Sequence, residues 1–190
     1  MSIDQNIVLW VNGHNTAFLD ELMWFISMPT TWIPLYVLLL CLLVFKVKDK
    51  SAILKILIGF AVAVALSDYI CSGVIKPLFQ WPRPSHDSTM PALHKVHGYV
   101  GGEFGFCSSH AANSMAVALL FSLLYRKTIA TVLLMIWVLV VCYSRIYLGA
   151  HYPIDIIAGL IIGSLFAVLV WLVLSIVYRV DEEELRKGDS

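Results

Sequence analysis

Two histidines, three cations and one aspartate gather in three short polar clusters that apolar sequence separates. The clusters are Lys76-Pro-Leu-Phe-Gln-Trp-Pro-Arg83, Cys107-Ser108-Ser109-His110, and Ser144-Arg145 followed by His151 and Asp155. A phosphoryl group in transfer spreads negative charge over three oxygens, so its catalysis is mainly positioning and electrostatic stabilisation. Cations, hydroxyls and imidazoles in one set therefore point to the chemistry of a phosphate ester.

The cations and serines suit an anion with the shape of phosphate. Arg83 and Arg145 have planar guanidinium groups that can each hold two oxygens, and Lys76 adds a point charge. Ser108 is a natural N-cap for the apolar run that follows, so backbone N–H groups near Ser109 would point at the same oxygens. We predict that these five residues bind phosphate.

The two histidines can divide the chemistry between them. One group must attack phosphorus, and another must protonate the departing oxygen. His151 and Asp155 are four residues apart, so a helix that begins near Pro153 would bring the carboxylate back to the imidazole. That contact would fix the tautomer and leave the other ring nitrogen free to attack. We predict His151 as the nucleophile, Asp155 as its partner and His110 as the general acid.

Long apolar runs position these clusters. The 190 residues are 59% hydrophobic and 14% charged, with zero formal net charge and a mean hydropathy of +0.82. Soluble domains carry about a quarter charged residues. A disordered chain, a disulfide scaffold and a nucleic-acid binder are therefore disfavoured. Five runs approach the roughly 20 apolar residues that a membrane helix needs: 22–45, 56–75, 104–125, 128–144 and 156–178.

The basic residues predict an orientation. Nine of the thirteen follow the first, third and fifth runs, on the side that the positive-inside rule makes cytoplasmic: Lys46, Lys48, Lys50, Lys55, Arg126, Lys127, Arg179, Arg186 and Lys187. The other four fall on the opposite face with all six histidines: Lys76, Arg83, Lys95 and Arg145. We expect the three polar clusters to meet there.

The expected fold class is all-α, a polytopic bundle of five transmembrane helices with an N-terminal interfacial helix over residues 3–12. One domain covers residues 1–190, with an interfacial segment at 1–20, an outer-face loop at 76–107 and a cytoplasmic tail at 179–190. Pro29 and Pro34 predict a kink in the first span near its outer end.

The three clusters together resemble the signature of the type-2 phosphatidic acid phosphatase superfamily, in the form Lys76-x6-Arg83-Pro84, Ser108-Ser109-His110 and Ser144-Arg145-x5-His151-x3-Asp155. The resemblance spans roughly residues 67–160. It implies a phosphohistidine intermediate at His151, proton donation by His110 and orientation of His151 by Asp155. It also implies phosphate contacts from Lys76, Arg83, Ser108, Ser109 and Arg145, with no metal and no other cofactor.

The second cluster departs from the family pattern. The family usually has Pro-Ser-Gly-His, whereas this chain has Cys107-Ser108-Ser109-His110. A glycine would matter if the backbone there had a positive φ, which serine adopts reluctantly. We favour the first turn of a helix at Ser109, where serine fits without strain.

The resemblance to small bacterial members implies a lipid phosphomonoester or diphosphate as substrate, and a multi-pass cell-membrane protein whose site faces the periplasm or exterior. Undecaprenyl diphosphate and lipid A phosphate lead, with phosphatidylglycerol phosphate and phosphatidic acid as further candidates. The expected partners are this substrate and membrane lipids, and no nucleic acid. The alternatives are an anion or lipid channel or carrier, a haloperoxidase and an inactive relative.

Three other features bear on the fold. Asp68 lies within the second run and either supports the site or makes a structural polar contact. Gly159-x3-Gly163 predicts close packing against another span of the same chain. Cys71 and Cys107 can both lie near the outer face, although we do not favour a disulfide between them.

Overall fold

The computed structural model describes residues 2–47 and 49–177, and these contain helices joined by loops, with no strand among them. The α-helices are α1 Ile3–Gly13, α2 Ala17–Ser27, α3 Ile33–Lys46, α4 Lys50–Asp68, α5 Lys76–Phe79, α6 Ser109–Tyr125, α7 Thr128–Tyr147 and α8 Pro153–Val177. A π-helical segment, Tyr69–Ile75, joins α4 to α5. Short 3-10 helices span Pro29–Trp32, Pro84–His86 and Val96–Gly98. The predicted tail at 179–190, with Lys48, Arg179, Arg186 and Lys187, lies outside the described residues.

Four helical stretches are long and apolar enough to cross a membrane: Pro29–Lys46, Lys50–Phe79, Thr128–Tyr147 and Pro153–Ile176. The third predicted run forms α6, which is apolar but has only 17 residues because its helix begins at Ser109. Residues 104–108 belong to the long loop between α5 and α6, in agreement with the prediction of Ser108 as the N-cap. The all-helical class is confirmed, whereas four of the five predicted spans meet these criteria of length and composition.

The prediction of one kinked helix over residues 22–45 is wrong. Helix α2 ends at Ser27, and α3 starts at Ile33 after a 3-10 turn. Met28 is extended, with φ −74° and ψ 125°, because Pro29 disfavours a helical conformation in the residue before it. Pro34 causes no kink, since it lies in the first turn of α3, where its missing N–H has no intrahelical acceptor to lose.

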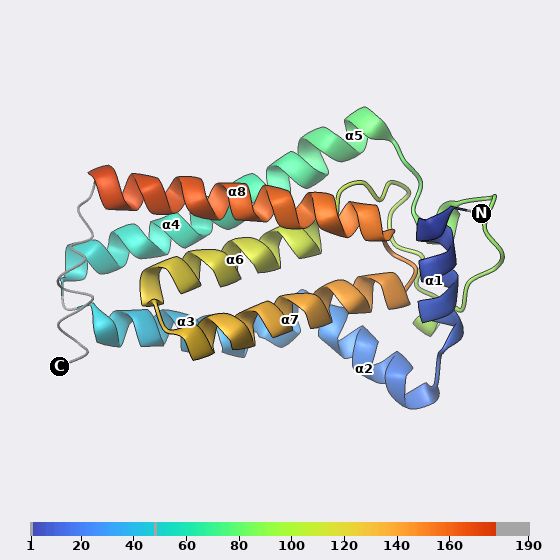
Figure 1. Cartoon of the computed structure of the whole chain (residues 1–190), viewed down its shortest axis with the longest axis horizontal. Coiled ribbons are helices and arrows are strands. Elements are labelled where there is room, and N and C mark those ends of the chain that lie inside the picture. Colours follow the sequence, from blue (N-terminus) through green and yellow to red (C-terminus); the bar gives the residue numbers. More distant parts are fainter. Residues whose placement is uncertain (1, 48, 178–190) are drawn as a thin grey trace.

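Helix α6 packs against α4, α7 and α8 (Figure 1). Two glycines of α8 allow its close approach: a Cβ on Gly159 would overlap the carbonyl oxygen of Ser108, and one on Gly163 would overlap that of Ala112. Such small-residue faces are the usual device for close helix packing in membranes. The predicted close packing of this glycine pair against another helix of the same chain is therefore confirmed.

The long loop and the N-terminal helices gather at one end of the bundle. Figure 1 shows α1 lying across the end where α6 and α8 begin and α7 ends. The turn from α6 to α7, with Arg126 and Lys127, lies at the opposite end, as do the end of α3 and the start of α4. The described basic residues around these turns are thus separated from the polar clusters by the length of the bundle.

Candidate active site

The three polar clusters meet at the loop end of the bundle. One pocket of about 850 Å³ is lined by six of the eight predicted site residues: Lys76, Arg83, Ser109, His110, Arg145 and His151. The other two are fully buried beside it, Ser108 as the N-cap of α6 and Asp155 against His151. Segments separated by up to 79 residues along the chain therefore form one cationic pocket.

Lys76 is held by two serines. Its Nζ donates to the hydroxyl of Ser109 at 3.0 Å and to that of Ser72 at 3.3 Å, and the two hydroxyl oxygens are 2.7 Å apart. Ser72 precedes Lys76 by four residues, so both side chains lie on one face of a continuous helical stretch. Ser109 thus presents its hydroxyl as well as its backbone to the pocket. The i, i+4 spacing is the sequence signal that could have identified Ser72.

Arg83 is fixed by the loop around it. Its Nε donates to the carbonyl of Phe104 at 3.2 Å, and its Nη1 donates to that of Ala150 at 3.4 Å. Gly101 has φ +65°, and a Cβ there would lie 2.9 Å from Nη1 of Arg83, so this position favours glycine. Burial lowers the pKa of Arg83 from its ordinary value, but an arginine in a protein keeps its charge.

Arg145 lies in the last turn of α7 and is only 4% exposed. Its Nη1 donates to the hydroxyl of Ser27 at the end of α2, and its Nη2 donates to that of Tyr99 at 2.8 Å. The guanidinium carbon also lies 5.6 Å from the centre of the Tyr99 ring. Sequence reasoning missed Ser27 and Tyr99. A serine in an apolar run and a tyrosine in a loop carry no local signal for contact with an arginine.

His151 and Asp155 are almost fully buried, at 1% and 2% exposed. Helix α8 begins at Pro153, as predicted, and turns the carboxylate back so that its Oδ2 lies 3.4 Å from Nδ1 of His151. Oδ2 already accepts the backbone N–H of Tyr152 at 2.9 Å, and the imidazole contact is not aligned as a hydrogen bond. Catalytic hydrogen bonds are often long before the substrate is bound.

The surroundings of His151 favour a neutral imidazole. Burial lowers its pKa well below the ordinary value of 6.5, and the charges of Arg145, Arg83 and Lys76 lower it further. Because Nδ1 faces Asp155, the other ring nitrogen, Nε2, is the one that can face a reacting phosphorus. A neutral nitrogen with its lone pair available is the form that a nucleophile requires.

Helix α6 begins at the pocket. Ser108 accepts a hydrogen bond from the N–H of Ala111 at 3.4 Å, and its own N–H donates to the carbonyl of Asp155 at 3.0 Å. Ser109 is the first helical residue and has no positive φ, so the serine that replaces the family's glycine is unstrained. The first N–H groups of a helix lack intrahelical acceptors and favour an anion.

The same pocket continues as an apolar trench between α3, α4 and α7. Leu39, Leu57, Val64, Trp137 and Val141 line this part. One end can therefore hold a phosphate group, and the remainder suits hydrocarbon. An amphiphile with a phosphorylated head matches both parts.

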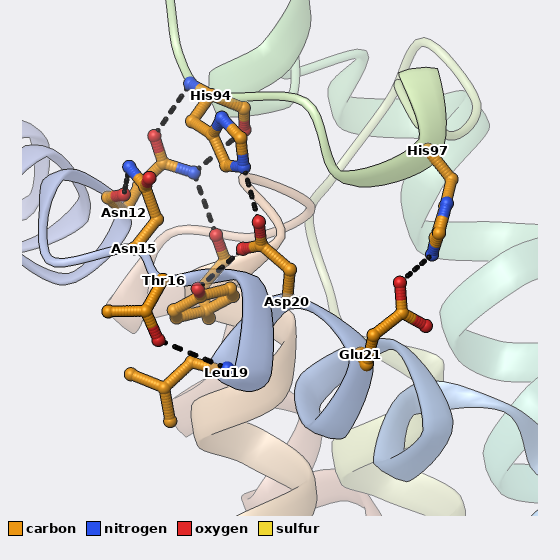
Figure 2. Close-up of polar contacts among 9 residues, drawn as sticks. Asn12, Asn15, Thr16, Leu19, Asp20, Glu21, His94 and His97 are labelled. Atoms are coloured by element: carbon orange, nitrogen blue, oxygen red, sulfur yellow. Dashed lines mark hydrogen bonds and ion pairs between the residues drawn. The ribbon is translucent and has the colours of Figure 1, made fainter.

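A polar network anchors the loop that carries Tyr99 (Figure 2). The Asn12 amide donates to the carbonyls of His94 and Tyr147 at 3.0 and 2.8 Å and accepts the N–H of His94 at 2.8 Å. Asp20 accepts the Tyr147 hydroxyl at 2.6 Å and pairs with His94 at 2.9 Å. Burial alone would raise the pKa of Asp20, but these two hydrogen bonds, together with the charges of His94 and His97, outweigh it and lower the pKa.

The other predicted features also have defined places. Asp68 accepts a hydrogen bond from Asn113 of α6 at 3.2 Å. No described hydrogen bond joins it directly to a predicted site residue. Cys71 and Cys107 are buried together and carry free thiols. They act as small packing residues where the π-helical segment meets the loop before α6.

Comparison with known proteins identifies the family. Residues 56–179 match the family model of the PAP2 superfamily. The chain belongs to the PAP2 superfamily. This confirms the resemblance drawn from the three clusters and, with the long apolar helices, makes the chain a multi-pass membrane protein.

Two curated relatives of this PAP2 chain are lipid A 4′-phosphatases, each 34% identical to it over 164 residues. In the relative from Bacteroides thetaiotaomicron the match covers 85% of this chain and 72% of the relative. In the one from Porphyromonas gingivalis it covers 86% and 69%. The solved transmembrane PAP2 type phosphatidylglycerolphosphate phosphatase from Bacillus subtilis is 21% identical, with a TM-score of 0.66 over 94% of this chain and 86% of that one. This last likeness is one of fold.

Proposed function

We propose that the chain is a membrane lipid phosphatase that uses a histidine nucleophile and no metal. The supporting observation is the single pocket in which Lys76, Arg83, Arg145 and two histidines adjoin an apolar trench. This combination fits a phosphate that remains attached to a lipid. A carrier would need the cations but not the His151–Asp155 pair.

The proposed reaction has two steps. In the first, Nε2 of His151 attacks phosphorus, an N–P bond forms, and the bond to the lipid oxygen breaks as His110 donates a proton to that oxygen. In the second, water attacks phosphorus, the N–P bond breaks, and His110 takes the proton from water. The products are inorganic phosphate and a lipid alcohol from a phosphomonoester, or inorganic phosphate and a lipid monophosphate from a diphosphate. Throughout both steps, Arg83, Arg145 and Lys76 hold the equatorial oxygens.

We further propose one domain over residues 1–190, with five spans that include α6 and with α1 at the membrane interface. The positive-inside rule supports a site that faces the periplasm or exterior, since the described basic turns lie at the other end of the bundle. A lipid of the outer leaflet could then enter the trench laterally. The names of the two 34% identical relatives favour lipid A phosphate as substrate. Undecaprenyl diphosphate is the second candidate.

The test is phosphate release from a panel of lipid A, undecaprenyl diphosphate, phosphatidylglycerol phosphate and phosphatidic acid in detergent. Wild type, His151→Ala and a control, His14→Ala at the exposed end of α1, would be compared. We expect release by wild type and the control and none by His151→Ala. Undiminished release by folded His151→Ala protein would contradict the proposal. EDTA should leave the rate unchanged, and vanadate should inhibit by occupying the phosphate position.

A further inference from the structure

A polar pair lies in the wall of the apolar trench, apart from the catalytic groups. Asp68 and Asn113 both line the pocket, and Nδ2 of Asn113 donates to Oδ1 of Asp68 at 3.2 Å. Asp68 is the only carboxylate among the described residues that line this pocket. An ionisable side chain within a membrane span is costly and usually has a function.

The pair lies where the part of a lipid next to its phosphate would sit. Asp68, Ser72 and Lys76 are spaced by four residues along one helical stretch, and all three line the pocket. The intervening Tyr69–Ile75 segment is π-helical, so the stretch from Asp68 to Lys76 makes about two turns. Asn113 follows His110 by three residues and lies one turn further along α6 on the same face. The pair is therefore one to two turns deeper than the phosphate-binding cations.

The polar atoms of this pair are mainly hydrogen-bond acceptors. The carboxylate of Asp68 is exposed to the pocket and accepts one described hydrogen bond. Oδ1 of Asn113 is buried and has no hydrogen-bond partner among the described residues. The acceptor open to a ligand is therefore the Asp68 carboxylate, which Asn113 holds in place and which can accept an O–H or N–H group of a lipid in the pocket.

We propose that Asp68 and Asn113 form a subsite for a hydroxyl or amide N–H group of the lipid close to its phosphate. This inference rests on the proposed function and deepens it. It favours phosphomonoesters of hydroxylated or N-acylated lipids, the chemistry that lipid A presents. It disfavours prenyl diphosphates, which carry no such donor and would place a second phosphate on the side of the Asp68 carboxylate, where like charges repel.

Two matched pairs of probes test the subsite. Ceramide 1-phosphate has N–H and O–H donors near its phosphate, whereas phosphatidic acid of equal chain length has only ester oxygens there. Geranylgeranyl phosphate and geranylgeranyl diphosphate differ only in the second phosphate. The wild type should hydrolyse ceramide 1-phosphate with a kcat/KM about tenfold above that for phosphatidic acid, the size expected for a hydrogen bond to a charged group. It should also prefer the prenyl monophosphate to the diphosphate.

Asp68→Ala and Asn113→Ala should each reduce the ceramide preference to about threefold or less. Asp68→Asn, which keeps an acceptor but removes the charge, should raise kcat/KM for the diphosphate relative to the monophosphate. Tyr69→Phe is the control, because Tyr69 is adjacent but does not line the pocket and is 63% exposed. It should keep the wild-type ratios.

The outcomes separate the subsite from the proposed function. If the wild type hydrolyses these lipids without preference, or if Asp68→Asn and Asn113→Ala keep its ratios, the subsite is refuted and the phosphatase proposal stands. If the wild type releases phosphate neither from these probes nor from the natural lipids, both proposals fail. Each variant should show the size-exclusion profile of the wild type, and Asp68→Asn, which is nearly isosteric, serves if Asp68→Ala does not fold.

Discussion

At the scale of single residues, His110 and His151 both face the pocket but have different proposed tasks. In the first step only the departing oxygen needs a proton from His110, so its replacement should cost that step least when the leaving group is already a good one. The value of kcat/KM reports this step alone, and we expect His110→Asn to lower it on a lipid phosphate by about 10²–10⁴-fold, the usual contribution of a general acid. On p-nitrophenyl phosphate the loss should be far smaller.

Steady-state rates on these two substrates give the measurement, with His151→Asn as the comparison. The nucleophile is needed whatever group departs, so His151→Asn should be inactive on both substrates. Equal losses on both substrates in His110→Asn would argue against proton donation by this residue.

The buried imidazole of His151 should also make the stability of the fold depend on pH. Its pKa is lowered well below 6.5 in the folded protein, so between that lowered pKa and about 6.5 the unfolded chain binds a proton that the folded chain does not. The free energy of unfolding therefore rises with pH in this window, and the contribution of His151 is fully present above it. Lowering the pH from 7.5 to 5.5 should cost the wild type about 1 kcal/mol through this group.

Thermal unfolding in detergent at the two pH values measures this effect. His151→Asn removes the titrating group and should show a smaller fall in Tm than the wild type. The idea fails if the two proteins lose the same Tm on acidification.

The residues of the candidate site differ in how far the sequence could predict them. Lys76, Arg83, Arg145 and the two histidines could be found because their types and spacing already describe phosphate chemistry. Tyr99 and Ser27 could not, because their contacts with Arg145 depend on how a loop and a helix end fold back in space. Asn113 was missed because one amide in an apolar helix gives no signal until Asp68 is seen beside it.

At the scale of elements, α2 anchors the loop that brings Tyr99 to Arg145. Asp20 is 19% exposed at its side chain and holds both Tyr147 and His94, whereas the neighbouring Glu21 is 69% exposed and pairs with His97. Asp20→Ala should release the loop, because it removes the hydrogen bonds from Tyr147 and His94. Each hydrogen bond to a charged group contributes about 1.5–3 kcal/mol. Glu21→Gln should change little, because exposed ion pairs contribute at most about 1 kcal/mol.

Hydrogen exchange of residues 94–99 checks this prediction. Exchange should be faster in Asp20→Ala and near wild type in Glu21→Gln. The phosphate analogue vanadate should also bind Asp20→Ala less tightly, because Tyr99 would no longer support Arg145. Similar exchange in both variants would contradict the role of Asp20.

The contact between α6 and α8 gives a second test at this scale. Gly163→Ala would place a methyl group against the carbonyl of Ala112, and overpacking of this kind costs about 1–3 kcal/mol. We expect a lower Tm in detergent. Gly13→Ala is the control, because nothing lies within 4 Å of the added methyl group, and it should keep the wild-type Tm. An unchanged Tm in Gly163→Ala would mean that the helices can separate without penalty.

The elements themselves were only partly predictable. Hydropathy and caps predicted α6, α7 and α8 well, because apolar runs end at polar residues there. The break between α2 and α3 could not be predicted from the same apolar signal, because hydropathy does not distinguish a helix from a turn. Only the restriction that Pro29 places on Met28, together with the capping of α2 carbonyls by Thr31 and Trp32, separates the two helices.

At the scale of the whole molecule, the described loop end and the basic end of the bundle should face opposite sides of the membrane. With Cys41 replaced by serine, Ser88→Cys in the long loop should react in intact cells with a membrane-impermeant maleimide able to reach the periplasm. Ser51→Cys at the start of α4 should react only after the cells are lysed. Both positions are exposed. Labelling in the reverse order would overturn the proposed orientation.

Ser108 takes part in two contacts of different kinds. The serine caps the helix that opens at the phosphate-binding pocket, and its carbonyl oxygen packs against Gly159 near the start of α8. Bundle assembly and the alignment of reacting groups are therefore not separable properties of this protein. A substitution at the buried contact between α6 and α8, chosen only to stabilise the fold, would therefore also change the rate of turnover.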